Sequence, residues 1–275
     1  MLATMHGKQR VIAPVLEQGL GLKVMLPAGL DTDRFGTFSR EVARTGSPLD
    51  TARAKIAAAF DCVPRARFGV ASEGSFGPDP FLPMLPLATE LVLLVDRESG
   101  FELTGQDLSR DTNYSHAIVP DVGAALAFAL RIGFPAHGLI VIGCDEGKPT
   151  PGRALIKDIP DHGALEQAVQ RVTTMCGAAF VETDMRADRN PTRMAAIERA
   201  TRDLVRRGQS RCPECACPGF DVTERVAGLP CASCGASTGV IRSEVLSCLA
   251  CGYRTERAAT SEATADPGRC DWCNP

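Results

Sequence analysis

Eight of the twelve cysteines lie in four Cys-x-x-Cys pairs within the last quarter of the sequence. The pairs are Cys212/Cys215, Cys231/Cys234, Cys248/Cys251 and Cys270/Cys273. A two-residue spacing lets both sulfurs of a tight turn reach one tetrahedral metal ion. Fifteen residues separate the first two pairs and eighteen the last two, and both gaps fit a zinc ribbon. We therefore predict two metal sites.

Four thiolates per ion leave no open coordination position, so the sites should be structural. Zinc is the expected metal and iron the second choice. The competing interpretation is a disulfide framework, but nothing upstream suggests secretion. Sequential pairing would give ribbons over residues 212–234 and 248–273. Interleaved pairing, first pair with third and second with fourth, stays open. Cys217 is interpreted as a spare thiol rather than a ligand.

Composition narrows the function classes. The chain has 275 residues, 44% of them hydrophobic, and a formal net charge of -3, which suits about two globular domains. Residues 211–275 carry six Arg against eight Asp or Glu. This region lacks a basic footprint, so a protein partner is favoured over nucleic acid. With no signal-peptide pattern and no apolar run of eighteen residues, we expect a cytoplasmic protein without membrane contact.

Strand-like and helix-like segments alternate over residues 1–207. The expected strands are 2–4, 22–26, 67–71, 91–95, 116–119, 139–142 and 178–181. The expected helices begin near Val11 and cover 49–60, 122–132, 163–176 and 191–207. This alternation predicts an α/β domain over 1–207, with a mixed or mostly parallel sheet and helices on both faces. Residues 208–275 would form a small double zinc-ribbon domain.

Polar side chains follow the first predicted strand and the strand at 67–71. Thr4, His6 and Lys8 precede a helix, a position that favours anions. Glu73, in a small-residue segment predicted to be a loop, could bind Mg²⁺. For each group the alternative is an ordinary polar turn.

A third polar segment follows the strand predicted at 178–181. Glu182 and Asp184 follow that strand, and Arg186 and Arg193 surround the start of the next helix. Guanidinium groups suit phosphate or carboxylate ligands. An elaborate helix cap with solvated charges is the alternative here.

Most of the chain resembles an uncharacterised bacterial family, a domain of unknown function with a cysteine-rich C-terminal tail. The matching segments are 3–8, 30–37, 71–78, 182–186, 190–193 and 270–275. This resemblance implies no activity.

The first hundred residues also resemble nucleotide pyrophosphatases of the inosine-triphosphatase and Maf-like type. Thr4, His6 and Lys8 fall near their Thr/Ser-x-Asn-x-x-Lys turn, Lys55 near an Ala- and Lys-rich helix, and Glu73 near a Mg²⁺-binding acidic loop. His6 replaces the Asn, a single acid replaces a pair, and a late Ser-His-Arg motif is missing. The resemblance implies an α/β fold and hydrolysis of nucleoside triphosphates.

Two functional hypotheses follow. In the first, the α/β domain binds a nucleotide or other phosphorylated small molecule, with Mg²⁺, and hydrolyses it. Lys8 and Arg186 or Arg193 would hold phosphates, Glu73 would bind the metal or position water, and Glu182 and Asp184 are the next candidate acids. In the second, the chain is a non-enzymatic adaptor whose zinc ribbons bind a protein. The sequence leaves the oligomeric state and the convergence of the three polar segments open.

Overall fold

The computed structural model describes residues 1–44 and 46–275. The chain divides into two compact units, Met1–Val205 and Arg206–Pro275, and each is described by itself. Among the described residues, no helix has both the length and the apolar character that crossing a membrane requires.

The first unit contains a sheet with strand order β1-β2-β3-β4. Its strands are β1 (Leu2–Ala3), β2 (Phe68–Pro78), β3 (Pro86–Asp96) and β4 (Glu102–Ser109). β1 pairs with β2 in parallel, whereas β2, β3 and β4 form an antiparallel meander. In the described part of the chain, β1 pairs with Val70 and Ala71 of β2, so β2 runs on well past the end of β1.

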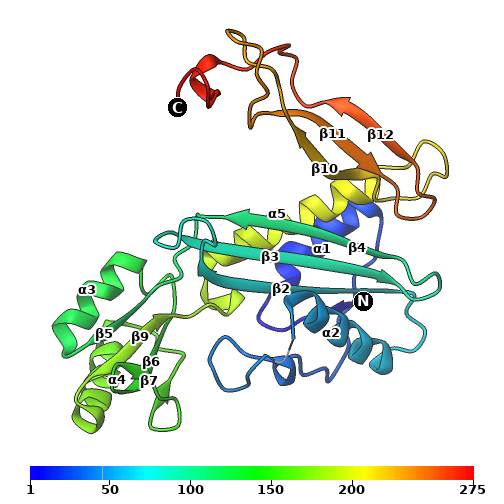
Figure 1. Cartoon of the computed structure of the whole chain (residues 1–275). Helices are drawn as coiled ribbons and strands as arrows, with labels where there is room; N and C mark the ends of the chain where they lie inside the picture. Colours follow the sequence, from blue (N-terminus) through cyan, green and yellow to red (C-terminus); the bar gives the residue numbers. More distant parts are fainter. Residues whose placement is uncertain (45) are drawn as a thin grey trace. The chain divides into compact units, whose positions relative to one another are not determined.

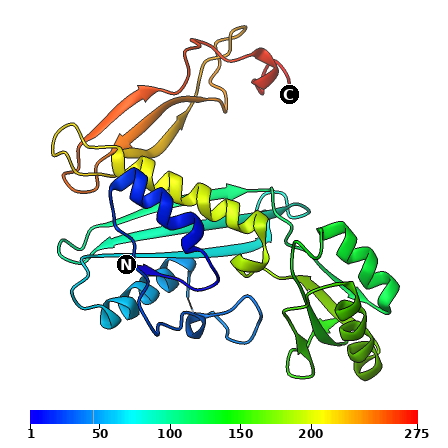
Figure 2. The ribbon, with the colours of Figure 1, turned by 180° about the vertical axis from the view of Figure 1, so that it is seen from behind.

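Helices cover both faces of this sheet (Figure 1). Helices α1 (Gln9–Leu20) and α5 (Pro191–Gln209) pack on Val70 and Val92, while α2 (Pro48–Cys62) packs on Ala71 and Leu93. The alternation follows from the two-residue repeat of a strand. Figure 2 shows α1 and α5 side by side. Gly19 permits their close approach, because a Cβ at this position would collide with the Val205 side chain.

A second sheet in the first unit is antiparallel throughout its described pairings. Its order is β5 (His116–Val119), β9 (Ala179–Thr183), β6 (Leu139–Asp145) and β7 (Lys148–Pro149), and β8 (Leu155–Ile156) also pairs with β6. Helices α3 (Val122–Ile132) and α4 (His162–Cys176) pack against it in one apolar cluster. Asp121 and Asp161 cap the two helices by accepting hydrogen bonds from backbone N–H groups.

The α/β class is confirmed and the first sheet is mixed, but the alternative prediction of a mostly parallel sheet is wrong. Among the described strands of the first unit, the β1–β2 pair is the parallel one. The order of elements suggested helical crossovers, yet short turns join β2, β3 and β4. β4 was not predicted, since Gly105 interrupts its apolar pattern. A Cβ at Gly105 would collide with the α5 backbone at Ala200 and Leu204, so the glycine permits close helix–sheet packing.

Two local predictions also fail. Residues 22–26 form no strand. The segment after Ala71, predicted to be a loop, continues β2 to Pro78. Glu73 therefore sits on a strand, paired in register with Leu91 of β3.

The second unit is built on a three-stranded antiparallel sheet, β10 (Asp221–Ala227), β11 (Ile241–Ser247) and β12 (Arg254–Ala258). Two short 3₁₀ turns of the first unit, η1 (Asp33–Phe35) and η2 (Ala187–Arg189), and one of this unit, η3 (Pro267–Arg269), complete the elements. The apolar cluster of the second unit is small: Phe220 packs with Cys212 and Cys248, against the half-buried Tyr253.

Candidate functional site

The cysteine pairs form two groups whose sulfur atoms lie within 4.8 Å of one another. One group joins Cys212 and Cys215 to Cys248 and Cys251. The other joins Cys231 and Cys234 to Cys270 and Cys273. The pairing is interleaved, so the sequential alternative is wrong. Each group offers four thiols at the spacing that a tetrahedral ion needs, so both could bind a metal ion.

Each group lies at one end of the three-stranded sheet. β10 leads from the first cysteine pair to the second, β11 returns to the third, and β12 leads to the fourth. Antiparallel strands bring alternate connections to the same end, so the first pair meets the third and the second meets the fourth.

Similar turns shape the cysteine pairs. The N–H of Gly235 donates to the Cys231 carbonyl, and that of Gly252 to the Cys248 carbonyl. Both glycines have positive φ, which glycine adopts without strain. In the first pair Ala216 holds this position, with φ 60°. Cys217 belongs to neither group of four, and its carbonyl accepts a hydrogen bond from the N–H of Cys212.

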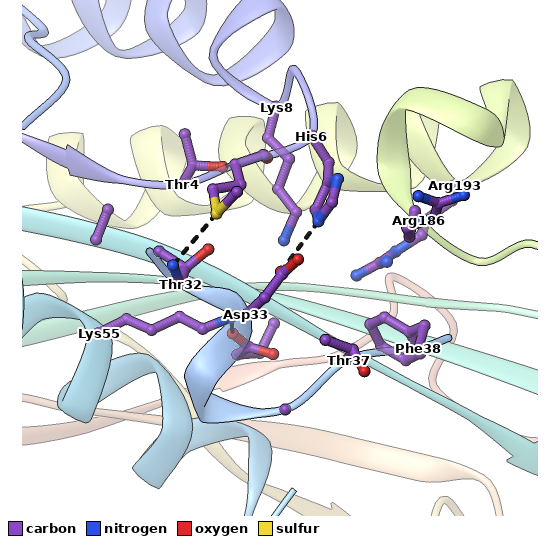
Figure 3. A pocket seen from close by; sticks show the side chains of 14 residues that line it. Thr4, His6, Lys8, Thr32, Asp33, Thr37, Phe38, Lys55, Arg186 and Arg193 are labelled. Atoms are coloured by element: carbon purple, nitrogen blue, oxygen red, sulfur yellow. Dashed lines mark hydrogen bonds and ion pairs between the residues drawn. The ribbon is translucent and has the colours of Figure 1, made fainter. Parts of the chain in front are cut away.

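In the first unit, one pocket brings together polar side chains that are far apart in sequence (Figure 3). Its space is about 450 Å³ with the open mouth included, and its interior is narrow. The residues that line it are Ala3, Thr4, Met5, His6, Lys8, Thr32, Asp33, Gly36, Thr37, Phe38, Lys55, Glu73, Arg186 and Arg193. Six of the eight predicted catalytic or phosphate-binding residues are among them.

Lys8 reaches the pocket because the chain leaves the sheet after Ala3. His6 and Gly7 take positive φ values of 59° and 70°, and this turn leads into α1. Beyond the short β1, the Lys8 ammonium donates to the Ser72 carbonyl at 3.1 Å. Lys8 is buried. Burial, followed by the nearby positive charge of Arg193, lowers the pKa of Lys8 to about 7.

Glu73 points to the opposite face of β2 from Ser72. It is buried and forms an ion pair with Lys55 of α2, and a second with Arg44 at 3.2 Å. Lys55 falls on the buried face of α2 with Ala52, Ile56 and Ala59. A lysine on an apolar helix face is a sequence signal for a buried partner, and here that partner is Glu73.

Arg193 and Glu90 form a buried ion pair, 2.6 Å between Nε and Oε1, with side chains 1% and 0% exposed. Gly74 lies opposite Glu90 in the β2–β3 register, and a Cβ there would collide with the Glu90 carboxylate. The Arg193 guanidinium also donates to the Met185 carbonyl and lies 4.3 Å from the Phe38 ring centroid.

Four buried polar atoms of this cluster have no hydrogen-bond partner among the described residues: Arg193 Nη2, Glu90 Oε2, Ser72 Oγ and Glu73 Oε1, the last of which forms the ion pair with Lys55. Buried polar groups in proteins are nearly always paired. Arg193 also lines the pocket, so a ligand atom could supply the partner that its Nη2 lacks.

The remaining ionic groups are held by partners. His6 lies 3.0 Å from Asp33 and 3.5 Å from Asp188. Arg186 contacts Asp184 at 2.6 Å and Asp158 at 2.9 Å. Burial by itself would lower the pKa of Arg186, but the hydrogen bonds and negative charges of these two carboxylates have the larger effect and raise it.

Glu182 and Asp184 do not line the pocket that holds Lys8. Asp184 forms an ion pair with Arg186 and borders another cavity. Glu182 borders a neighbouring cavity and accepts hydrogen bonds from Arg40 at 2.7 Å and 2.9 Å. The hydrogen bond to Glu182 raises the Arg40 pKa. The two acids proposed as second candidates are thus each paired with an arginine.

Cationic side chains outnumber carboxylates among the residues that line the Lys8 pocket. Four cationic side chains, Lys8, Lys55, Arg186 and Arg193, line it against two carboxylates, Asp33 and Glu73. A pocket of this size and charge suits a small anion with several oxygen atoms. The sequence analysis missed Asp33 and Phe38 because they come from an irregular segment with no periodic signal.

Comparison with known proteins identifies a family. Searches of curated proteins and of solved structures found no match to this chain. A family model, described as a domain of unknown function (DUF6671), matches residues 59–275. This range is well over half of the chain and includes the cysteine pairs, which confirms the resemblance to an uncharacterised family. The similarity to Maf-like pyrophosphatases stays a prediction. The chain belongs to the DUF6671 family.

Proposed function

We propose that the first unit binds a phosphorylated small molecule in the Lys8 pocket. The observation that supports this most directly is the buried Arg193 Nη2, which lacks a partner among the described residues, in a pocket lined by three further cations. Lys8 also supports the proposal. Its ammonium has three N–H donors, and the described contacts use one of them, to the Ser72 carbonyl. Lys8, Lys55 and Arg193 would bind phosphate oxygens, and Arg186 would contribute positive charge to the pocket lining.

Glu73 is the proposed carboxylate for hydrolysis of a bound phosphoanhydride. It lies beside Lys55 and Arg44, and a phosphate that attracts these cations would free its oxygens. Glu73 would then accept a proton from water as the water oxygen bonds to phosphorus and the bridging P–O bond breaks. Glu73 and Asp33 are the carboxylates in the wall that could hold Mg²⁺, which would neutralise phosphate charge.

The test is release of phosphate or pyrophosphate from a panel of nucleoside triphosphates with Mg²⁺. Glu73→Gln should lower the rate about 10²- to 10⁴-fold, the usual worth of a general base, with an unchanged circular dichroism spectrum. Glu98→Gln, which alters an exposed glutamate, is the matched control. A fully active Glu73→Gln variant would remove Glu73 from the reaction. No release from any nucleotide would exclude nucleotide hydrolysis and leave binding to be tested with pyrophosphate.

In the second unit we propose two structural zinc ions, one per group of four cysteines. The donor sets consist of thiols alone, which suits zinc better than magnesium or calcium. The unit buries few large apolar side chains, so binding of metal would supply much of its folding free energy.

An adaptor role is the second candidate, favoured by two exposed apolar side chains within the cysteine pairs. Leu249 is 87% and Trp272 82% exposed, and tryptophan is common at protein-binding hot spots. A Leu249→Ala/Trp272→Ala variant should keep both metal ions and lose a co-purifying protein. Co-purification of nucleic acid that salt removes would contradict the preference for a protein partner.

A further inference from the structure

A second pocket in the first unit adjoins the Lys8 pocket, and half of its lining residues are aromatic or apolar. The two share Thr37 and Phe38 in their walls. The second pocket is larger inside than the first and more open, with about 550 Å³ including its mouth. Its further wall residues are Arg40, Phe76, Tyr114, Glu182, Thr183 and Met185.

The aromatic rings of this pocket contact one another in a row. Phe38 and Phe76 have centroids 5.3 Å apart in an edge-to-face arrangement, and Phe76 and Tyr114 stack at 6.0 Å. All three side chains are only partly buried. Aromatic side chains left partly open at a pocket wall offer stacking area for a planar ring.

Arg193 connects the two pockets. It lines the Lys8 pocket, and its guanidinium lies 4.3 Å from the Phe38 centroid and 5.2 Å from the Phe76 centroid. The cation proposed to bind phosphate thus stacks on rings of the aromatic pocket. In Figure 3, Phe38 and Thr37 lie at the same end of the Lys8 pocket as Arg193. A single ligand could therefore place its anionic group in the Lys8 pocket and its planar ring in the aromatic pocket.

The aromatic pocket also has a polar group that can select among rings. Glu182 is buried, and Arg40 holds its carboxylate through a bidentate contact. Each carboxylate oxygen has two acceptor sites, so Glu182 can still accept from a ligand N–H. A fixed acceptor beside stacked aromatic rings suits a heterocycle that carries N–H donors at its edge.

We propose that this pocket holds the base of a nucleotide whose phosphates occupy the Lys8 pocket, with Glu182 as the residue that selects bases by their N–H donors. The assignment rests on the proposed phosphate site. It adds that Phe76, Tyr114 and Glu182 contact the base rather than the phosphates. Guanine, with adjacent N1–H and N2–H donors, fits a carboxylate better than adenine, which offers one amino group.

The experiment compares a ligand without a base with ligands that have one. The full chain with its metal is titrated calorimetrically with inorganic pyrophosphate and with analogues of GTP and ATP in which both phosphoanhydride bridges are replaced by methylene or imido groups, so that turnover does not interfere. The variants are Tyr114→Ala and Glu182→Gln. Phe81→Ala is the control, since Phe81 is 89% exposed in the β2–β3 connection and outside both pockets.

Tyr114→Ala should weaken binding of the GTP analogue about 5- to 150-fold, the range for one base–aromatic stack. The affinity for pyrophosphate should stay unchanged. Glu182→Gln should reduce the preference for the GTP analogue over the ATP analogue. Phe81→Ala should change neither.

Equal affinity for pyrophosphate and both analogues, unaffected by Tyr114→Ala, would overturn the base pocket and leave the phosphate site standing. Failure of pyrophosphate and nucleotides alike to bind would overturn the phosphate site, and the base pocket with it.

Discussion

The two units of this chain are stabilised by different interactions. The first has apolar clusters whose members come from distant parts of the chain, such as Leu2, Val92 and Leu204. The second has one small cluster around Phe220 and two groups of four cysteines, one at each end of its sheet. The second unit should therefore depend on metal and the first on packing and buried ion pairs. The predictions below test this contrast, from the largest expected effect to the smallest.

The largest effect should come from the cysteines. Cys212→Ser/Cys248→Ser removes two ligands of one site and should lower the metal content from two ions to one. Cys212→Ser/Cys231→Ser damages both sites and should lower it to none. Each structural zinc site is worth about 10–16 kcal/mol, so the second variant should unfold residues 206–275. Native mass spectrometry counts the ions, and hydrogen exchange should show the first unit still protected.

Sequential pairing would reverse the two metal counts. Should either variant lose the whole unit, cadmium-113 NMR of the unmutated protein still decides the pairing, because through-bond correlations assign each cysteine to its ion. A correlation that joins Cys212 and Cys231 to one ion would contradict the interleaved arrangement.

A smaller effect is expected in the first unit, at the buried pair of Arg193 and Glu90. Arg193→Met leaves Glu90 uncompensated and should lower the free energy of unfolding by about 3–5 kcal/mol. Arg202→Met, on the same helix, removes an exposed partner of Glu198 and should cost no more than ~0.5 kcal/mol. Hydrogen exchange of β3 amides reports on this unit alone. Equal effects of the two variants would refute the importance of the buried pair.

The last effect concerns Lys8 and depends on pH. Its pKa is lowered to about 7 by burial, against about 10.4 in an unfolded chain. Below pH 7 both states are protonated, so the folded protein bears the full cost of a buried charge. Between pH 7 and 10.4 the unfolded chain binds more protons, so stability rises with pH. Lys8→Met should thus stabilise the first unit at pH 6, by an amount that shrinks toward pH 10.

Denaturant titrations of Lys8→Met and the unmodified chain at pH 6, 8 and 10 measure this trend. Lys23→Met, which alters a lysine of an irregular segment, serves as the control. A stabilisation that is independent of pH would mean that lost charge at Lys8 is not its cause.

Local signals determined much of what the sequence could predict. Ser47 and Pro48 begin α2 as expected, because a capping side chain and a fixed φ act within one turn. Residues 122–132 form α3 at the predicted bounds. The cysteine pairs were recognisable because the two sulfurs of each pair are set by a single turn.

Tertiary structure decided which cysteine pairs share an ion. β10, a seven-residue strand, extends about 20 Å at ~3.3 Å per residue, which separates the first pair from the second. The return of β11 brings the third pair back to the first. Spacing between pairs does not encode this, since both pairings fit the same gaps.

The candidate pocket also depended on tertiary structure. Lys8, Lys55, Glu73 and Arg193 were marked by residue type, but sequence distance says nothing about their convergence. The continuation of β2 past Ala71 put Glu73 and Gly74 on opposite faces of one strand, one toward Lys55 and one toward Arg193. Residue types determined which chemistry the chain can perform, and the pairing of strands determined where those groups meet, because strand pairing joins residues that no local pattern relates.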